Sequence, residues 1–338
     1  MNFMTENAAL DNLNTFQVAA NCRYLVEIRT ITDLQTAIEH PRFTADNFLV
    51  LGSGSNVLFS GDYPGWVLRM ASAGITVVDE DETSVLIKAG AGVNWHDLVT
   101  TAVDSGWFGI ENLALIPGTV GAAPIQNIGA YGVEFSTVMH SLSAFNMRAG
   151  ELVTMYPEDC RFGYRHSLFK EAKDFIVTDV TLRLSKQPVL NTTYGGIDQQ
   201  LASAGIDHPT PIDIKNIVTE IRQSKLPDPM HLGNAGSFFK NPVLPKSTVH
   251  DLQADYPALP VFPAGSSNRK ISAAWLIEQC GWKGKRIKNC GVYAGHALIL
   301  VNYGGASGAA IVRLARDITE SVFSSFEIRL EPEVRIIG

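Results

Sequence analysis

A glycine-rich loop joins two apolar stretches that both favour strands, and this order limits the folds open to the chain. Asn47-Phe-Leu-Val-Leu51 reads as a buried strand that runs into Gly52-Ser-Gly-Ser-Asn56, and Val57-Leu-Phe59 follows as a second strand. A Rossmann fingerprint needs G-x-G-x-x-G at the start of a helix, but Val57 stands at the third glycine position. The loop can instead point successive N–H groups and two hydroxyls at a phosphate without a lysine. The sequence therefore predicts a phosphate-binding loop outside the Rossmann class.

The chain of 338 residues has a net charge of −7. Such an acidic chain argues against nucleic acid as the main partner, because a phosphate backbone calls for a basic surface. An anionic ligand must therefore be met by a local basic cluster. The N-terminus lacks a signal-peptide pattern, and no run approaches the ~18 apolar residues of a membrane helix. We expect a cytoplasmic protein, without a membrane partner, that acts as a monomer.

Metal and P-loop motifs are absent from the sequence. The four cysteines show no metal-type spacing and are expected to be buried thiols, and the eight histidines form no H-E-x-x-H motif. No G-x-x-x-x-G-K-[ST] occurs either. We predict no metal site.

The length of the chain is enough for two or three domains, and its patterns predict both strands and helices. Strands are expected at 24–28, 66–70, 75–79, 84–89, 138–147, 175–184 and 297–301, and helices at 95–103, 213–224, 246–254, 271–280 and 308–323. Asn94 is the expected cap of the first of these helices, and Thr32 with Gln35 forms a capping-box pattern for an earlier short one. A proline at 188 and the turn Thr192-Thr-Tyr-Gly-Gly196 follow the last predicted strand, and we place a domain boundary near residue 186.

The stretch from Gly233 to Pro242 gathers small, polar and basic residues and is expected to form a loop that presents Ser237. Ser237-Phe-Phe-Lys240 also matches the S-x-x-K of penicillin-recognising acyl enzymes. That motif must open a helix, but Pro242 leaves barely one turn for it, and no Lys-Thr-Gly occurs. We therefore set serine acyl transfer aside, and note that Lys240 places a positive charge three residues from the Ser237 hydroxyl.

The chain ends in an alternating pattern that predicts a strand over 328–336, with Ile328, Leu330, Val334 and Ile336 on one face. Pro332 implies a strand edge or break. Carboxylates beside such a break could line a cleft, but the pattern cannot choose Glu331 over Glu333.

Six motifs in this order resemble the UDP-N-acetylenolpyruvoylglucosamine reductase (MurB) family. They are Leu51-Gly-Ser-Gly-Ser-Asn-Val-Leu58, Ile116-Pro-Gly-Thr-Val-Gly121, Gln126-Asn-Ile-Gly-Ala-Tyr-Gly132, Tyr164-Arg-His-Ser167, Gly236-Ser-Phe-Phe-Lys-Asn-Pro242 and Leu330-Glu-Pro-Glu-Val334. The resemblance implies an FAD-binding fold of the PCMH, or vanillyl-alcohol-oxidase, type. Two α+β subdomains would span roughly 16–185 with a boundary near 70–80, a smaller α+β substrate-binding domain 186–330, and a C-terminal strand with the catalytic glutamate 331–338.

The same resemblance implies the reaction. NADPH as co-substrate would reduce FAD, which would then reduce UDP-N-acetyl-3-O-(1-carboxyvinyl)-glucosamine to UDP-N-acetylmuramate for peptidoglycan synthesis and cell-wall biogenesis. Hydride would come from flavin N5 and the proton from Ser237. The segment around Tyr194 resembles the form of the family that closes a tyrosine-bearing loop over the UDP-sugar.

Roles are implied residue by residue. Arg165 would hold the charge of the enolate, aided by Glu331 in protonated form or through water, and Ser237 would be the proton donor. The implied cofactor-binding residues are Gly52, Ser53, Gly54, Ser55, Asn56, Ile116, Pro117, Gly118, Gly121, Asn127 and Gly129. The implied substrate-binding residues are Tyr194, Arg222, Lys225 and Asn241.

Two other readings stay open at this point. One keeps the fold but makes the chain an FAD oxidase or dehydrogenase acting on another alcohol or sugar; turnover with oxygen would separate the two. The other is a nucleotide-sugar sensor without flavin, which would be colourless when purified.

Overall fold

The computed structural model describes residues 4–338, and the chain divides into two compact units. The first consists of residues 1–8, 22–53 and 64–224, and the second of 9–21, 54–63 and 225–338. The chain therefore passes between the units several times, and one passage falls inside the glycine-rich loop, after Ser53. We describe each unit by itself.

The first sheet of unit one has the order β1-β2-β5-β3. Its strands are β1 (Thr5–Ala9), β2 (Asn21–Ile28), β5 (Tyr63–Met70) and β3 (Phe48–Leu51), and β3 runs parallel to β5. Helix α1 (Ile31–Ile38) begins at a capping box of Thr30 and Asp33. The capping box predicted at Thr32 and Gln35 is therefore wrong by two residues, because the helix starts earlier than its apolar pattern indicates.

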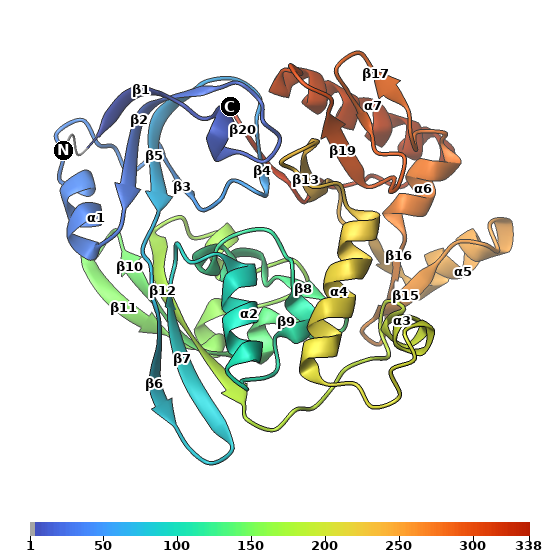
Figure 1. Cartoon of the computed structure of the whole chain (residues 1–338). Helices are drawn as coiled ribbons and strands as arrows, with labels where there is room; N and C mark the ends of the chain where they lie inside the picture. The colour runs from blue at the N-terminus through green and yellow to red at the C-terminus, as the bar shows by residue number, and fades with distance from the viewer. Residues whose placement is uncertain (1–3) are drawn as a thin grey trace. The chain divides into compact units, whose positions relative to one another are not determined.

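The second sheet of unit one is antiparallel, with the order β11-β10-β12-β7-β6. Its strands are β11 (Glu151–Met155), β10 (Met139–Asn146), β12 (Phe175–Ser185), β7 (Ser84–Gly90) and β6 (Ile75–Glu80). Helix α2 (Trp95–Asp104), capped by Asn94 as predicted, shares one apolar core with β7 and β12 (Figure 1). Burial of this core is the main source of the unit's stability.

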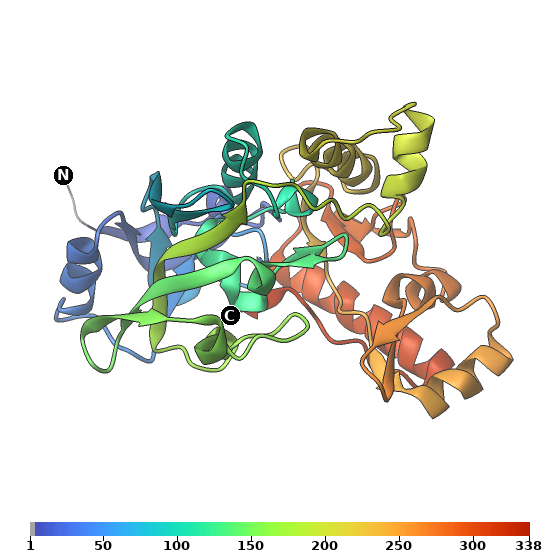
Figure 2. The ribbon, with the colours of Figure 1, turned by 90° about the horizontal axis from the view of Figure 1, so that it is seen from below.

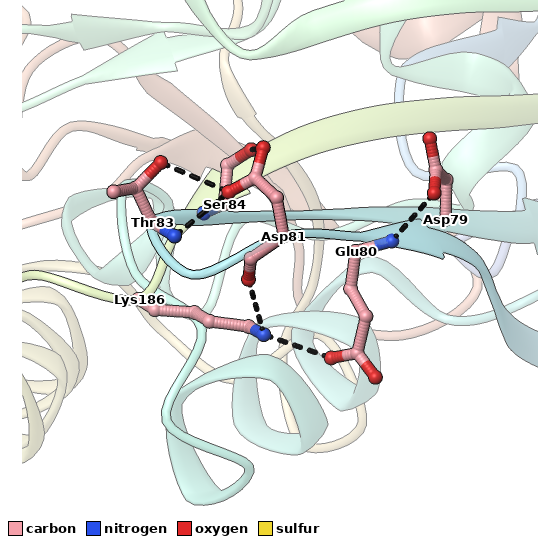
Figure 3. Close-up of polar contacts among 6 residues, drawn as sticks. All are labelled: Asp79, Glu80, Asp81, Thr83, Ser84 and Lys186. Atoms are coloured by element: carbon pink, nitrogen blue, oxygen red, sulfur yellow. Dashed lines mark hydrogen bonds and ion pairs between the residues drawn. The ribbon is translucent and has the colours of Figure 1, made fainter.

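The turn between β6 and β7 is held by the carboxylate of Asp81 (Figure 3). It accepts hydrogen bonds from the backbone N–H and the hydroxyl of both Thr83 and Ser84, at 2.7–3.1 Å. Lys186 Nζ donates to the carbonyl oxygen of Asp81 at 2.7 Å and pairs with Glu80 at 2.8 Å. The exposed hairpin is thus fixed by side-chain contacts rather than by core packing.

Helices α3 (Ile197–Ser203) and α4 (Pro211–Lys225) bury apolar side chains in the same core as α2. These include Ile197 and Leu201 of α3, and Ile214 and Val218 of α4. Residues 186–224 therefore belong to the first compact unit, although the sequence analysis assigns them to a separate domain. The pattern near residue 186 marks the end of β12 rather than the edge of this core.

Unit two has a sheet of order β13-β19-β18-β17 and a smaller sheet of order β14-β16-β15. The strands are β13 (Gly233–Ser237), β19 (Ile299–Asn302), β18 (Cys290–Val292), β17 (Arg286–Ile287), β14 (Val243–Pro245), β16 (Asn268–Ile271) and β15 (Val261–Ala264). Helix α7 (Gly308–Phe326) packs on β18 and β19 and on helix α6 (Ala273–Gln279), while α5 (Lys246–Asp255) covers the smaller sheet (Figure 2).

The C-terminal strand β20 (Arg335–Ile337) pairs in parallel with β4 (Val57–Phe59), also in unit two. The predicted strand over 328–336 is therefore mostly wrong. Pro332 forms only an isolated bridge with Phe239, and the register changes after it, so that Ile336 is exposed and Ile337 buried. Glu331 accordingly lies before the C-terminal strand and not on it. The break predicted at Pro332 is confirmed.

The remaining elements are short. Strands β8 (Gly129–Ala130) and β9 (Val133–Glu134) form a hairpin, and 3₁₀ helices lie at Asp11–Leu13, Glu111–Leu113, Val120–Ala122, Pro124–Gln126, Phe135–Thr137, Pro157–Cys160 and Leu168–Lys170. Within residues 4–338, we find no helix of the length and apolarity needed to cross a membrane. All four cysteines are free thiols.

Candidate functional site

Gly52 lies against Thr119 in the first unit. A Cβ built on Gly52 would come within 2.5 Å of Thr119 Oγ1, so no larger residue fits there without a shift. Thr119 Oγ1 is also the one buried side-chain oxygen or nitrogen in the described part of the chain without a hydrogen-bond partner. A buried hydroxyl normally has a partner, so this one indicates a missing polar ligand. The hydroxyl and the open backbone of Gly52 fit a phosphate group of the FAD that the resemblance implies.

Gly54 and Asn56, on the other side of the unit boundary, are held by unit two. Gly54 has φ +67°, and a Cβ there would lie 2.0 Å from the carbonyl oxygen of Leu13. Asn56 Nδ2 donates to the carbonyl oxygen of Glu333 at 3.3 Å, and the N–H of Arg335 donates to the carbonyl oxygen of Asn56 at 3.0 Å. Asn56 therefore fixes the segment that carries the C-terminal carboxylates. Of the two loop serines, Ser53 is exposed and Ser55 half-buried.

The segment that starts at Ile116 packs against the start of α2 and the end of β7. The carbonyl oxygen of Gly118 accepts the N–H of Trp95 at 3.1 Å, and the N–H of Gly121 donates to the carbonyl oxygen of Ala91 at 2.9 Å. A Cβ on Gly121 would lie 2.5 Å from that of Ala91. Ile116 is half-buried and Pro117 exposed. The glycines here permit a close approach of backbone to backbone.

Asn127 and Gly129 contact protein groups rather than open space. Asn127 is 1% exposed, donates to Glu134 Oε2 and the carbonyl oxygen of Gly163, and accepts the N–H of Ser136. Its side chain is therefore structural, and a contact with a cofactor would use its backbone. The carbonyl oxygen of Gly129 accepts a hydrogen bond from Arg165 Nη2 at 2.9 Å.

Arg165 lies at the tip of a two-residue turn. Gly163 and His166 exchange backbone hydrogen bonds at 3.0 and 3.1 Å, and Arg165, the second central residue, has φ +52°, the left-handed conformation that a type II turn places there. Lys170 Nζ donates to the carbonyl oxygen of Arg165 at 2.7 Å. The guanidinium is thus aimed by both its backbone and Gly129.

Arg222, on α4, lies near Arg165 and Tyr131 within the first unit. Burial lowers the pKa of its guanidinium; Tyr131 opposes that shift, and the positive charge of Arg165 adds to it. Its Nε donates to the carbonyl oxygen of Leu115 at 3.2 Å. Among residues 4–338 no carboxylate forms an ion pair with Arg222. A partly buried guanidinium without a described carboxylate partner can bind an anion.

Tyr194 belongs to the same unit but lies on its surface. Its side chain is 46% exposed, on the segment that leads into α3. Such a residue is available to a ligand without any change in the core.

Ser237 ends β13 next to a bulge. The expected loop is instead a strand over its first half, since Gly233, Asn234 and Ser237 pair with β19. Gly236 has φ +67°, and its N–H donates to Asn234 Oδ1 at 2.9 Å. Phe238, directly after the serine, is fully buried. The bulge and this anchor fix the backbone at Ser237, a half-buried residue.

Lys240 and Glu331 form an ion pair in unit two. Lys240 Nζ lies 3.1 Å from Glu331 Oε2, and the backbone N–H of Lys240 donates to the carbonyl oxygen of Glu331 at 2.9 Å. Lys240 is therefore a partner of Glu331, whereas the sequence analysis considered it for Ser237.

Asn241 and Lys225 lie in the same unit. Asn241 Oδ1 accepts the N–H of Ala273 at 3.0 Å, which leaves its Nδ2 as a donor. Lys225 is exposed at the end of α4 and lies near His296. Burial and then the charge of Lys225 lower the pKa of His296. Both Asn241 and Lys225 can thus bind an anionic ligand.

The predicted site residues fall into two groups. Arg165, Arg222 and Tyr194 belong to the first unit, whereas Ser237, Glu331, Lys225 and Asn241 belong to the second. Sequence reasoning missed Thr119 and also His96, whose Nδ1 accepts the backbone N–H of Leu115 at 3.0 Å. Thr119 carries a signal only as the polar residue of a glycine-rich motif, and His96 carries none, because its partner is a backbone group brought to it by folding.

The chain matches two known protein families and many individual relatives. Residues 228–337 match the family described as UDP-N-acetylenolpyruvoylglucosamine reductase, C-terminal domain, and residues 22–156 match a family described as FAD binding domain. Proteins named UDP-N-acetylenolpyruvoylglucosamine reductase from Xanthomonas axonopodis pv. citri and Amoebophilus asiaticus are each 47% identical to the chain. The matches cover 99% of this chain and 96% and 99% of those proteins.

A solved structure gives the same similarity. The crystal structure of UDP-N-acetylenolpyruvylglucosamine reductase (MurB) from Thermus caldophilus is similar with a TM-score of 0.71 at 25% identity. The similarity covers 99% of this chain and 100% of the other.

Proposed function

The chain belongs to the UDP-N-acetylenolpyruvoylglucosamine reductase family and is an FAD-binding oxidoreductase, and we propose that it reduces UDP-N-acetyl-3-O-(1-carboxyvinyl)-glucosamine to UDP-N-acetylmuramate with NADPH. The product is a precursor of peptidoglycan. The proposal extends to the roles of individual residues, each supported by contacts within one unit.

The observation that carries the proposal is the charge of Arg222. Its guanidinium is partly buried, lies near Arg165 and pairs with no described carboxylate. Such an arrangement is unfavourable in the free protein and becomes favourable when an anion binds. The enolpyruvyl group of the UDP-sugar carries a carboxylate, and an arginine fork binds a carboxylate through two parallel hydrogen bonds. Arg222 would bind this carboxylate, and Arg165 would hold the negative charge that builds on it during reduction.

Thr119 and Gly52 support the binding of FAD in the first unit. The partnerless hydroxyl of Thr119 would donate to a phosphate oxygen, and Gly52 would let that oxygen approach the backbone. We propose Ser53, Gly118 and Gly121 as further residues of the first unit that shape this site, and Gly54, Ser55 and Asn56 of the second unit as FAD-binding residues. When bound, the flavin supplies hydride from N5 to the enolpyruvyl double bond.

Ser237 would donate the proton that completes the reduction. Its backbone is held by the bulge at Gly236 and by buried Phe238. Positioned proton transfer typically contributes ~10²–10⁴-fold to a rate. Lys240 would position Glu331 through the ion pair and the backbone hydrogen bond, so that the carboxyl group is held in one place for the enolate or for a water.

Tyr194, Lys225 and Asn241 would bind the diphosphate. Their exposure, charge and free Nδ2 group suit an anion. We propose that residues 186–330 supply these contacts with the diphosphate, even though α3 and α4 share the core of the first unit. We also propose that the protein works in the cytoplasm as a monomer.

The test is turnover under anaerobic conditions. NADPH oxidation should depend on the enolpyruvyl UDP-sugar and should yield UDP-N-acetylmuramate in equal amount. An oxidase would instead consume NADPH or an alcohol only when oxygen is present, and a sensor would be colourless and would not consume NADPH. Either of those results contradicts the proposal.

A further inference from the structure

Two side chains hold the peptide groups on either side of Leu115. The N–H of Leu115 donates to His96 Nδ1 at 3.0 Å, and its carbonyl oxygen accepts Arg222 Nε at 3.2 Å. Leu115 has φ +55°, a left-handed conformation that costs a non-glycine residue roughly 1–3 kcal/mol. The conformation persists because surrounding contacts hold it, and these two hydrogen bonds are the direct ones.

The start of α2 anchors the whole segment around Leu115. Trp95 Nε1 donates to the carbonyl oxygen of Leu113 at 3.0 Å, and the backbone N–H of Trp95 donates to the carbonyl oxygen of Gly118 at 3.1 Å. His96 lies between these two anchors and holds the middle of the segment. Because Trp95 is fully buried, loss of the His96 contact would affect Leu115 while both ends of the segment stay in place.

The contact sets the protonation state of His96. Its Nδ1 accepts a hydrogen bond, so the imidazole must be neutral with its proton on Nε2. Burial lowers the pKa of His96; Asp97, on the same helix, opposes this, and Lys215 and Arg222, on α4, add to it. Lys215 is itself paired with Asp104 at 3.2 Å. A protonated ring would turn an N–H group toward the N–H of Leu115 and break the contact.

We propose that His96 is a positioning residue for Arg222, because its neutral imidazole fixes the Leu115 carbonyl that orients the guanidinium, and binding of the UDP-sugar is thereby coupled to the protonation of His96. The proposal rests on the proposed function for the identity of the ligand. His96 itself would not contact the UDP-sugar, so its effect is on affinity rather than on the chemical step.

The test measures the affinity of the oxidised, FAD-loaded protein for the enolpyruvyl UDP-sugar by calorimetry, from about pH 5 to pH 8, the range over which histidine changes charge. Wild type is compared with His96→Asn and His96→Gln. The asparagine oxygen can stand where Nδ1 stands and does not titrate, whereas the glutamine amide reaches the position of Nε2 instead. The substrate's carboxylate and diphosphate stay ionised throughout this range.

The wild type should lose affinity as the pH falls through the pKa of His96, by about tenfold for each further unit, since only the neutral fraction is competent. His96→Asn should bind like the wild type near pH 8 and should lack this loss. His96→Gln should bind roughly tenfold more weakly at every pH. The kcat of each variant at saturating sugar should remain close to that of the wild type.

A wild-type affinity without this pH dependence, or the same dependence in His96→Asn, overturns the inference. So does tight binding by His96→Gln. If His96→Gln does not fold, as judged by its FAD content and thermal unfolding, the pH dependence of the wild type and of His96→Asn still tests the inference. Failure of the wild type to bind the UDP-sugar at any pH contradicts the proposed function, and this inference with it.

Discussion

Lys240 contacts Glu331 twice: its ammonium nitrogen lies 3.1 Å from Glu331 Oε2, and its backbone N–H donates to the Glu331 carbonyl oxygen at 2.9 Å. The two residues are 91 positions apart in the sequence. The isolated bridge between Phe239 and Pro332 continues this contact, so the segment before the C-terminal strand is aligned with the residues that follow Ser237. The carboxyl group of Glu331 therefore has a defined place although its side chain is 74% exposed.

Replacement of Lys240 should impair the position of Glu331 without affecting the flavin. We expect Lys240→Met to lower kcat with the UDP-sugar by roughly tenfold, since a hydrogen bond to a charged group is worth about 1.5–3 kcal/mol and exposure reduces that value. Reduction of the flavin by NADPH should keep its rate. Lys240→Arg is the matched control and should retain most of the activity. Equal kcat in Lys240→Met and wild type would refute the role.

Replacement of Arg222 should weaken substrate binding without harming the fold. Arg222→Met removes a partly buried charge that no described carboxylate compensates, but it also removes the hydrogen bond from Nε to the Leu115 carbonyl oxygen, and these two effects on stability oppose each other. We expect a thermal unfolding midpoint that changes little, together with a KM for the UDP-sugar raised by roughly 10–100-fold, the loss of about 1.4–3 kcal/mol of binding energy. Thermal unfolding and steady-state kinetics on the same sample check both. A lower midpoint with an unchanged KM would mean that Arg222 is structural.

Thr119→Val should have opposite effects on the free and the FAD-loaded protein. Valine has nearly the same shape but no hydroxyl, so the FAD-free protein should be more stable by about 1–3 kcal/mol, the cost of an unsatisfied buried hydroxyl. FAD should bind roughly tenfold more weakly, since a hydrogen bond to a phosphate oxygen is lost. Denaturant unfolding with and without FAD measures both. Unchanged FAD affinity would show that the hydroxyl does not face the cofactor.

The hairpin tip at Asp81 should contribute to stability against acid (Figure 3). Hydrogen bonds from Thr83 and Ser84 hold the pKa of its carboxyl below the usual range. Because the folded-state pKa lies below the unfolded value of about 3.9, the contribution is fully present above the unfolded pKa and is lost as the pH falls through the folded one. Asp81→Ala should therefore destabilise the protein at neutral pH and less so in acid. A destabilisation independent of pH would contradict this.

The elements that the sequence predicts best are those whose signals are local. The strand–loop–strand order around Gly52 and the helix capped by Asn94 are both confirmed, because strand patterns and a capping side chain act over a few residues. In the loop, Val57 at the third glycine position also excludes a Rossmann fingerprint.

The failures have physical causes. Gly233 to Ser237 has the composition of a loop, but pairing with β19 overrides it. The alternating pattern near Glu331 predicts a continuous strand, but Pro332 limits it to a single bridge with Phe239. In the candidate site, resemblance supplied the charged residues, whereas Thr119 and His96 are recognised only from an unsatisfied hydroxyl and a backbone contact. Both depend on neighbours distant in sequence.

The central claim, that Ser237 supplies the proton for reduction of the enolpyruvyl sugar, is tested most directly by following the two half-reactions separately. Wild type and Ser237→Ala are reduced by NADPH without oxygen, the UDP-sugar is added, and the return of the yellow flavin absorbance is timed. We predict equal rates of flavin reduction and a reoxidation that is ~10²–10⁴-fold slower in Ser237→Ala. Reoxidation at the same rate in both proteins would contradict the account.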